Sequence, residues 1–492
     1  MTKQTTMKTK FYILLLLITA PLFVACSSDD EENGDVSGIA TRFTPSQEST
    51  KYFANGIDFG ANSSEQTVTF TTNKRWTASS TESWCTITPS KGSADDGAMT
   101  IRVSENKSDE NREAIVTLKT DELNSYITVR QGGAGTAKLY VYPAGTLEQQ
   151  LGNDYENIKE LILTGELNGT DFLFLHAKMY NIEGLDLSEA RIVSGGDSYI
   201  PVFNGSAELY TETDKVTESL LIDFRKAKSI KLPTSITSIG VSALARCQEL
   251  TSIDIPQGVT SIDDSAFWGC YNLSSVNIPE TVTKIGEWAF SYCIHLAKIK
   301  LPEGVTKLSY GLFQFCSDLK DITYSSKLDS IESDVFKGCT SLEKIIIPKS
   351  VKYLSGYAWP DCTNLKTLEY HSEKIWYSQN TGCPNVSNII IGDEVQEINH
   401  WAFFDYEALR TLTIPANVKK LNGEILLNCN METLYMEAMT PPETDGCLIR
   451  FTEDTSWVDV MDKCTLYVPK GAKPAYEVAG YPWTGFKEIV EY

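Results

Sequence analysis

Histidine is scarce in this 492-residue chain, and the motifs that usually carry enzyme chemistry are absent. None of its four histidines lies in an H-E-x-x-H motif or beside a C-x-x-C pair. There is also no G-x-S-x-G, phosphate-binding loop or G-x-G-x-x-G. Acidic residues are common, but glycoside hydrolysis needs two carboxylates about 5–9.5 Å apart in a cleft. We therefore expect binding rather than catalysis, with no cofactor and no metal, and keep an unrecognised hydrolase as the enzymatic alternative.

Positive charge is also in short supply. The 65 acidic and 43 basic residues give a net charge of −22. So acidic a surface repels nucleic acid and anionic lipid headgroups, which excludes both as expected partners. The chain is also too long for a single hydrophobic core, so two to four domains are expected.

Beyond its first 26 residues the chain has no long hydrophobic run. Three lysines precede the apolar stretch "FYILLLLITAPLFV", which is too short to span a membrane as a helix. The stretch ends in Ala25-Cys26, which resembles a bacterial lipobox, although Phe23 stands where Leu is usual. The resemblance implies removal of residues 1–25 and acylation of Cys26. An ordinary signal peptide cut near Ala25 is the alternative.

An acidic run, "SSDDEENGDVSG", follows Cys26 directly. It resembles the export tag of Bacteroidetes lipoproteins, which implies a lipid anchor in the outer membrane with the protein facing the cell exterior. Its composition also predicts a solvated tether over 26–38, and the two interpretations are compatible.

Residues 39–133 read as short strands with alternating polar and apolar residues. Examples are "EQTVTFTTN", "AMTIRVSEN" and "REAIVTLKT", separated by turns rich in Gly, Asn and Ser. This pattern predicts an all-β, immunoglobulin-like sandwich.

The stretch "KRWTASSTESWCTITPSKGS", together with "IRVSEN" and "ITVRQ", resembles a BACON domain. The family implies carbohydrate binding, and aromatic faces stack on sugar rings, so Trp76 and Trp84 are candidate sugar-binding residues. Either tryptophan could instead pack in the core of the sandwich. The domain could equally be a spacer that lifts the next domain off the membrane.

A cysteine recurs every 23 residues, with one interval of 21, through much of the second half of the chain. The series is Cys247, Cys270, Cys293, Cys316, Cys339, Cys362, Cys383 and Cys429, with Tyr406 taking one slot. The unit is C-x-x-L-x-x-I-x-I-P-x-x-V-x-x-I-x-x-x-A-F-x-x. A fixed period in the twenties predicts a solenoid whose stacked coils bury apolar residues that one coil cannot bury alone.

The cysteine slot has a packing explanation. Parallel side chains do not converge on one metal ion, and bridges between them are geometrically awkward, so we expect small, buried, free thiols. Cys447 and Cys464 lie outside the series and could pair. The coil at 370–383 is two residues short and lacks the A-F pair, so it should be irregular and could bend the array.

The repeat closely resembles the BspA-type (Treponema pallidum-type) leucine-rich repeat of bacterial surface proteins. The resemblance implies adhesion to host matrix protein, mucin, other bacteria or glycan. The expected divisions are a signal peptide at 1–25, a tether at 26–38, a BACON-like sandwich at 39–133, an N-terminal cap with irregular repeats at 134–228, regular repeats at 229–437 and a C-terminal cap at 438–492.

Each coil offers outward side chains beside the buried "I-x-I" positions. The candidate ligand face comprises Lys298, Lys300, Thr323, Lys344, Ile346, Glu369, Ile390, Thr413 and Tyr435. Exposed Ile346, Ile390 and Tyr435 indicate a contact patch, or else irregular edges. We expect a non-enzymatic surface lipoprotein that binds ligands through this face. The alternative is a polysaccharide-capture protein in which the BACON-like domain binds the sugar.

Overall fold

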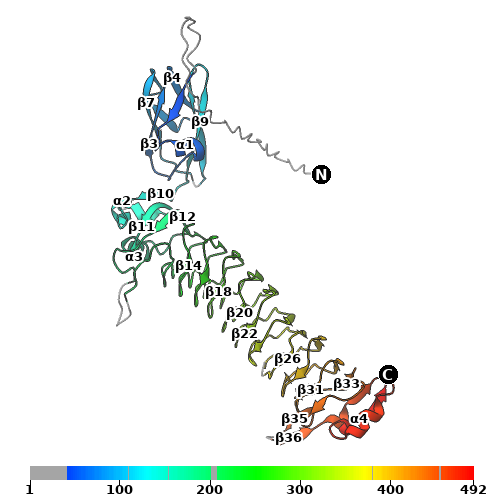
Figure 1. Cartoon of the computed structure of the whole chain (residues 1–492). Helices are drawn as coiled ribbons and strands as arrows, with labels where there is room; N and C mark the ends of the chain where they lie inside the picture. The colour runs from blue at the N-terminus through cyan, green and yellow to red at the C-terminus, as the bar shows by residue number, and fades with distance from the viewer. Residues whose placement is uncertain (1–40, 109, 153, 201–207, 379–380, 454–455) are drawn as a thin grey trace, which may run out of the picture.

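The computed structural model describes residues 41–108, 110–152, 154–200, 208–378, 381–453 and 456–492. Two separate hydrophobic cores lie within them, one between Ile57 and Val129 and the other between Val141 and Phe486. Figure 1 shows the smaller body at the N-terminal end of an elongated stack of coils. The predicted fold class, an all-β sandwich followed by a solenoid of short strands, is confirmed.

The sandwich consists of two sheets that share the first core. Alternation along its strands places Val68 and Phe70 inside and Thr69 between them outside. One sheet has the order β1 (Phe43–Pro45), β3 (Ser64–Thr72), β7 (Asp95–Val103), β5 (Cys85–Thr88). The other has the order β2 (Ile57–Phe59), β9 (Asn124–Gln131), β8 (Arg112–Lys119), β4 (Trp76–Ser80), β6 (Lys91–Gly92), with α1 (Thr50–Asn55) beside β9.

The solenoid begins with longer parallel strands. These are β10 (Thr136–Val141), β11 (Glu160–Leu167) and β12 (Gly184–Ile192), which are accompanied by α2 (Leu147–Leu151), a 3-10 turn at Asp154–Asn157 and α3 (Gly169–Lys178). Asn168 caps α3, and the Asp171 carboxylate accepts the backbone N–H groups of Asn168, Gly145 and Leu147. The buried Asp171 therefore ties the first helix turn to the preceding loop.

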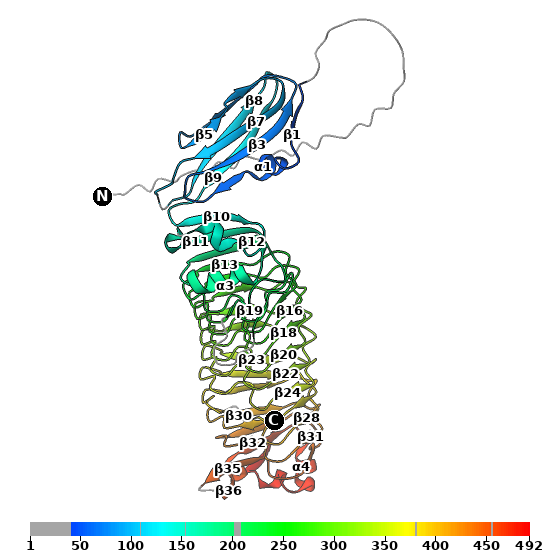
Figure 2. The same cartoon turned by 90° about the vertical axis from the view of Figure 1, so that its left-hand side faces the viewer.

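The regular coils contribute two sets of parallel strands on different sides of the solenoid (Figure 2). The first set, the ligand-face set, is β13 (Ser229–Lys231), β15 (Ser252–Asp254), β17 (Ser275–Asn277), β19 (Lys298–Lys300), β21 (Asp321–Thr323), β23 (Lys344–Ile347), β25 (Thr367–Tyr370), β27 (Asn388–Ile391), β30 (Thr411–Ile414) and β33 (Thr433–Met436). The second set, the side set, is β14 (Ser238–Ile239), β16 (Ser261–Ile262), β18 (Lys284–Ile285), β20 (Lys307–Leu308), β22 (Ser330–Ile331), β24 (Tyr353–Leu354), β26 (Lys374–Ile375), β28 (Glu397–Ile398), β31 (Lys420–Leu421) and β34 (Glu443–Thr444).

Residues one period apart pair with each other, so the 23-residue repeat becomes a ladder of matching side chains. Ile253 pairs with Val276, and Ile239 pairs with Ile262. The phenylalanine slot forms a stack in which the rings of Phe267 and Phe290 are 5.3 Å apart and nearly parallel. Every coil thus buries its apolar residues against the same residues of its neighbours.

Each regular coil turns through residues in the left-handed backbone region. In one coil these are Trp288 (φ 52°) and Tyr292 (φ 60°), and Trp401 (φ 54°) takes the equivalent of the first position further along. Bulky side chains rarely adopt this conformation, so coil-to-coil bonds must hold it. Phe267 N, for example, donates to Ala289 O and Trp288 N to Tyr310 O, at 2.8 and 2.9 Å.

The short coil predicted at 370–383 is irregular on one side only. Five residues separate Pro348 from Leu354, but only three separate the equivalent His371 and Ile375. On the ligand-face side, pairing of β25 with β27 continues across the shorter interval. On the other side β24 and β26 belong to different sheets. The side set is also interrupted between β18 and β20, where no residue is missing.

The C-terminal end closes the array with atypical elements. β29 (Phe403–Phe404), β32 (Leu426–Leu427), β35 (Ile449–Glu453) and β36 (Ser456–Asp459) form a further sheet. β37 (Thr465–Val468) and β38 (Glu488–Glu491) extend the ligand-face set. A 3-10 turn precedes β37 at Met461–Lys463, and α4 (Lys473–Ala479) lies beside another at Trp483–Gly485. Tyr476 and Trp483 are buried there, which covers the last coil.

Candidate binding surfaces

The ligand-face residues point away from the solenoid core. Seven of the nine are exposed, and Glu369 and Tyr435 are half-buried. They stand in register, because Lys300 pairs with Thr323, Ile346 with Glu369 and Glu369 with Ile390. Ile346 and Ile390 are 38% and 40% exposed, and they lie on β23 and β27, the two edge strands of a three-stranded sheet. The structure therefore presents them as members of one flat surface.

Three of the four charged residues on this face, Lys300, Lys344 and Glu369, form ion pairs. The Lys344 ammonium lies 2.5 Å from one carboxylate oxygen of Glu369, and His371 Nε2 lies 2.7 Å from the other. Lys344 and His371 lower the pKa of Glu369, while the Glu369 hydrogen bond raises the pKa of His371 against the opposing effect of burial. Lys300 Nζ lies 3.0 Å from Glu280 Oε1.

Aromatic rings close the C-terminal end of the same face. The Tyr435 ring stacks on Tyr467 with centroids 4.7 Å apart, and Tyr492 meets it edge-on at 5.6 Å. Tyr467 and Tyr492 lie in the C-terminal cap and were not among the residues predicted from the repeat. Tyr467 pairs with Tyr435 through β37, which the 23-residue pattern does not contain, and Tyr492 directly follows β38.

The cysteine series lies inside the solenoid, and each thiol has a specific partner. Cys316 Sγ donates to the carbonyl oxygen of Phe290 in the previous coil at 3.1 Å, and the other seven make the equivalent bond at 3.1–3.4 Å. Burial raises the pKa of Cys316 to about 12. Cys447 and Cys464 are buried and form no disulfide bond with each other.

The structure corrects one of the two candidate sugar-binding tryptophans. Trp76 is 3% exposed and packs edge-on against Phe70, so its ring belongs to the core of the sandwich. A Cβ built on Gly92 would come 2.5 Å from the Trp76 indole, which shows how closely the ring is covered. Trp84 is half-buried against the same core, and the Arg112 guanidinium lies 4.4 Å from its ring centre. The Trp76 indole therefore offers no open face, and Arg112 lies over one face of the Trp84 indole.

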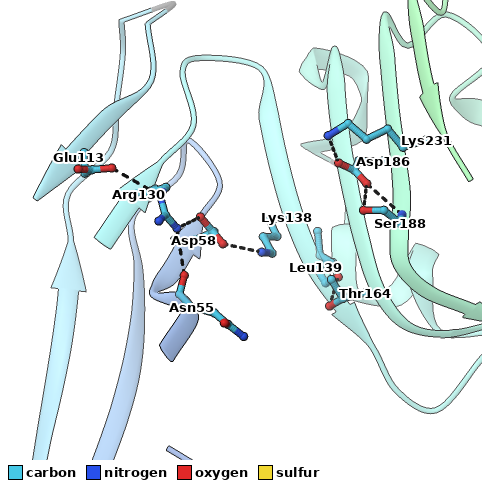
Figure 3. Close-up of polar contacts among 10 residues, drawn as sticks. All are labelled: Asn55, Asp58, Glu113, Arg130, Lys138, Leu139, Thr164, Asp186, Ser188 and Lys231. Atoms are coloured by element: carbon cyan, nitrogen blue, oxygen red, sulfur yellow. Dashed lines mark hydrogen bonds and ion pairs between the residues drawn. The ribbon is translucent and has the colours of Figure 1, made fainter. Parts of the chain in front are cut away.

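A cleft of about 950 Å³ separates the sandwich from the first strands of the solenoid. Sequence reasoning missed it, because its walls come from segments far apart in the chain. Figure 3 shows Arg130 and Lys138 approaching Asp58 from the two sides of this joint. The Asp58 carboxylate lies 3.3 Å from Arg130 and 3.1 Å from Lys138, and Ala61 N donates to Thr136 O at 2.8 Å.

Most charges around this interdomain cleft pair with one another. Lys231 lies 2.7 Å from Asp186, and Arg130 also lies 3.5 Å from Glu113. Burial and the neighbouring Glu183 carboxylate raise the pKa of Glu160. Clefts between domains are common ligand sites, but paired charges of both signs favour a joint between the two bodies over a site for a charged ligand.

Three further expectations concern the lipid anchor, metal binding and membrane-spanning helices. Cys26 lies outside the described residues. Within the described ranges, no cluster of three or more His, Cys, Asp and Glu is placed to hold a metal ion. In the same ranges, no helix combines the length and apolar character needed to cross a membrane.

Comparison with known families agrees with the ladder geometry. The model for the BspA type leucine-rich repeat region, in six copies, matches residues 214–343 and 329–441. Residues 214–441 are a BspA-type leucine-rich repeat region. The model for the viral BACON domain matches residues 45–134, so the sandwich that precedes the BspA-type region is a BACON-type domain. Neither family is a catalytic one.

Solved structures similar to the chain include other leucine-rich proteins. A leucine-rich cell surface protein from Faecalibacterium prausnitzii is 22% identical, with 60% of this chain and 86% of that chain covered and a TM-score of 0.35. A leucine-rich repeat protein from Bacteroides ovatus is 18% identical, with 76% and 98% covered and a TM-score of 0.42. No curated protein sequence matches the chain.

Proposed function

We propose that this chain is a non-enzymatic, lipid-anchored cell-surface protein that binds a surface ligand through the ligand face of its repeats. The ligand is a protein or mucin of a host or of another bacterium, and the protein acts in adhesion. The BACON-type domain then serves mainly as a spacer between the membrane and the repeats.

The observation that carries this proposal is the pair of exposed isoleucines. Ile346 and Ile390 flank Glu369 on three adjacent paired strands, each about 4.8 Å from the next. Isolated exposed apolar residues are ordinary, but two in register on a flat sheet favour contact with a partner. The ion pair of Lys344 with Glu369 and the stacked tyrosines Tyr435 and Tyr467 supply a polar and aromatic surround, as protein interfaces do.

The place of the protein at the cell surface rests on its repeat family and on the N-terminal sequence. Acylation of Cys26 would anchor the mature chain in the outer membrane. Labelling cells with radioactive palmitate tests this step, because the wild type should be labelled and Cys26→Ala should not. Equal labelling of the two would contradict the lipid anchor.

The alternative, polysaccharide capture by the BACON-type domain, now has less support. Trp76 is in the core and Trp84 is covered by Arg112, so stacking on a sugar would need a rearrangement or another surface of the domain. Trp84→Ala also tests weak carbohydrate binding by this domain.

Binding of the purified chain to immobilised mucin, matrix proteins and glycans tests the proposal. Ile346→Asp with Ile390→Asp should abolish binding to a protein or mucin. Ile115→Asp is the matched control, because Ile115 is 41% exposed on strand β8 of the sandwich. Retention of binding by the double variant would contradict a role for the ligand face. Binding that Trp84→Ala alone abolishes would favour polysaccharide capture.

A further inference from the structure

A shallow groove of about 550 Å³ lies on the side set of strands, away from the ligand face. It crosses five successive coils and is lined chiefly by Tyr353, Trp376, Tyr377, Asn399, Asn422 and Asp445. Five coils at about 4.8 Å each make it about 19 Å long from first to last. In Figure 2 the strands that carry it, β24, β28 and β31, follow one long edge of the solenoid.

The groove lies where the repeat is two residues short. The shortened loop between His371 and Lys374 precedes β26, which does not belong to the same sheet as β24. Trp376 and Tyr377 occupy the positions that Ser355 and Gly356 hold in the preceding coil. The Tyr377 ring lies against Gly356, where an added Cβ would come 2.8 Å from Tyr377 Cδ1. A small residue in one coil therefore makes room for a large ring from the next.

The aromatic rings of this groove are partly open to solvent. Tyr353 is 54% exposed, and Trp376 and Tyr377 are half-buried. The rings of Tyr377 and Trp401 lie 5.6 Å apart at 34° to each other. Rings held in fixed positions and open on one side present the flat apolar face on which the C–H groups of a sugar ring pack.

The wall beyond the rings is polar and fixed. Asn422 Nδ2 donates to Asn399 Oδ1 at 2.7 Å and to Glu397 Oε1 at 3.1 Å, and Asp445 Oδ1 accepts Gly423 N at 2.5 Å. These three hydrogen bonds occupy the Nδ2 group of Asn422, Asn399 Oδ1 and Asp445 Oδ1. Among the bonds between described residues, Asn422 Oδ1, Asn399 Nδ2 and Asp445 Oδ2 have none and can bond a ligand. Both donors and acceptors remain, which is what hydroxyl groups require.

The groove is also held rigid from behind. Trp401 Nε1 donates to Glu424 Oε2 at 3.0 Å, and the His400 ring stacks on Trp401 at 4.9 Å. The Arg450 guanidinium bonds the other oxygen of Glu424. Trp401 has a left-handed backbone, so these bonds hold a conformation that a bulky residue rarely adopts. A preorganised site costs less to order on binding.

The charge of the groove narrows the choice of ligand. The described residues that line it include no lysine or arginine, and Asp445 lies at one end. The chain as a whole carries −22, so an anionic polymer would be repelled. The groove is too polar and too open for a small apolar ligand, which prefers an enclosed site.

We propose that this groove binds a neutral oligosaccharide, whose rings stack on Trp376 and Tyr377 and whose hydroxyl groups bond Asn399, Asn422 and Asp445. This site goes beyond the ligand face, because it lies on a different set of strands and its ligand belongs to a different chemical class. The solenoid would then carry two binding surfaces.

The test uses the purified full-length mature chain and calorimetric titration with neutral hexasaccharides of glucose, xylose and mannose. A heparin hexasaccharide is the anionic counterpart. At least one neutral sugar should bind, and Tyr377→Ala and Asn422→Ala should each raise its Kd by about tenfold or more. Trp288→Ala is the matched control, since Trp288 takes the slot of Trp401 and packs on Tyr310 at 5.0 Å outside the groove. Trp288→Ala should leave Kd unchanged.

Several outcomes would overturn the proposal. They are failure of all three neutral sugars to bind, preference for the heparin fragment, or equal binding by wild type and the groove variants. If Tyr377→Ala fails to fold by circular dichroism, Tyr353→Ala decides in its place, because more than half of the Tyr353 side chain is exposed. Ile346→Asp should not change sugar binding, so failure of the ligand-face proposal is distinguishable from failure of this one.

Discussion

The Cys316 thiol lies 3.1 Å from the carbonyl oxygen of Phe290, which belongs to the previous coil. The same bond recurs from Cys247 to Cys429 and joins each coil to its neighbour through the buried interior. The cysteine slot is therefore more than a small apolar position. It supplies a weak donor to a carbonyl group, and Tyr406 replaces it once with a hydroxyl group that accepts Trp359 Nε1 at 3.4 Å.

Replacing Cys316 should separate packing from hydrogen bonding. Cys316→Ala removes the sulfur and its bond, and we expect the free energy of unfolding to fall by about 1–2 kcal/mol. Cys316→Ser keeps a donor and should cost less than Cys316→Ala. Urea unfolding followed by circular dichroism measures both. Equal losses for the two variants would show that the hydrogen bond contributes nothing.

The thiols should be inert in the folded chain. Burial raises the pKa of Cys270, Cys316 and Cys429 to about 12, so their thiolate fraction at pH 8 is negligible. Because the raised pKa favours the neutral thiol in the folded state, its stabilising effect is complete below about pH 8.5 and declines as the pH rises toward 12. Iodoacetamide with mass spectrometry should label the described cysteines only after unfolding in urea. Labelling of Cys316 in the native chain would contradict this.

His371 should make the stability of the short coil depend on pH. Its pKa is raised by the Glu369 carboxylate at 2.7 Å, with Glu394 at 3.3 Å and Lys344 nearby on Glu369. The imidazolium therefore stabilises the fold below about pH 6.5, and this contribution is lost as the pH rises through the higher folded-state pKa. His371→Gln should lower the unfolding midpoint at pH 5.5 and have less effect at pH 9. The effect should stay below about 1 kcal/mol, because water screens these groups.

Glu369→Gln is the companion variant for that experiment. It removes the main partner of His371, so most of the pH-dependent difference should disappear. A difference between wild type and His371→Gln that is the same at both pH values would refute the titration of His371 as its cause.

The joint between the two bodies should depend on Asp58. Asp58→Asn weakens contacts to Lys138 at 3.1 Å and Arg130 at 3.3 Å, so small-angle scattering should report a broader range of shapes. Global stability should change by less than about 1 kcal/mol, because these groups are partly exposed. Glu65→Gln is the control, since Glu65 pairs with Arg102 within the sandwich. Identical scattering from Asp58→Asn and wild type would show that the ion pair does not restrain the joint.

The two tryptophans of the sandwich should behave differently on substitution. Trp76→Ala leaves a cavity in the first core and should cost about 3–5 kcal/mol, enough to unfold a small domain of ordinary stability. Trp84→Ala removes a half-buried ring and should cost less. Thermal unfolding monitored by near-UV circular dichroism compares them. A smaller loss for Trp76→Ala would place its ring outside the core.

The sequence predicts the solenoid well, because each repeat must bury the same positions. Leu250, Ile253 and Phe267 are buried as the period requires, and the outward positions of the ligand face are exposed or half-buried. The groove near Trp376 could not be predicted in the same way. A period shows that a coil is two residues short but does not show which side of the coil changes or which rings come together there.

The interdomain cleft also could not be predicted from the sequence. Asp58 and Lys138 are 80 residues apart, and nothing in either local pattern indicates that they meet. For Trp76 the sequence already allowed a position in the core, and the packing of Phe70 and Gly92 against its ring decides between the core and a sugar-binding surface.

Coil-to-coil bonding also has an evolutionary consequence. Each coil presents to the next a surface nearly identical to the one it receives, as Ile239 with Ile262 and Ile262 with Ile285 illustrate. Unequal recombination that deletes or duplicates one 23-codon unit would bring together two coils whose stacking surfaces already match. The number of coils, and with it the reach of the molecule from the cell, can therefore change between lineages without a new fold, whereas a two-codon loss such as that near His371 alters the surface of a single coil.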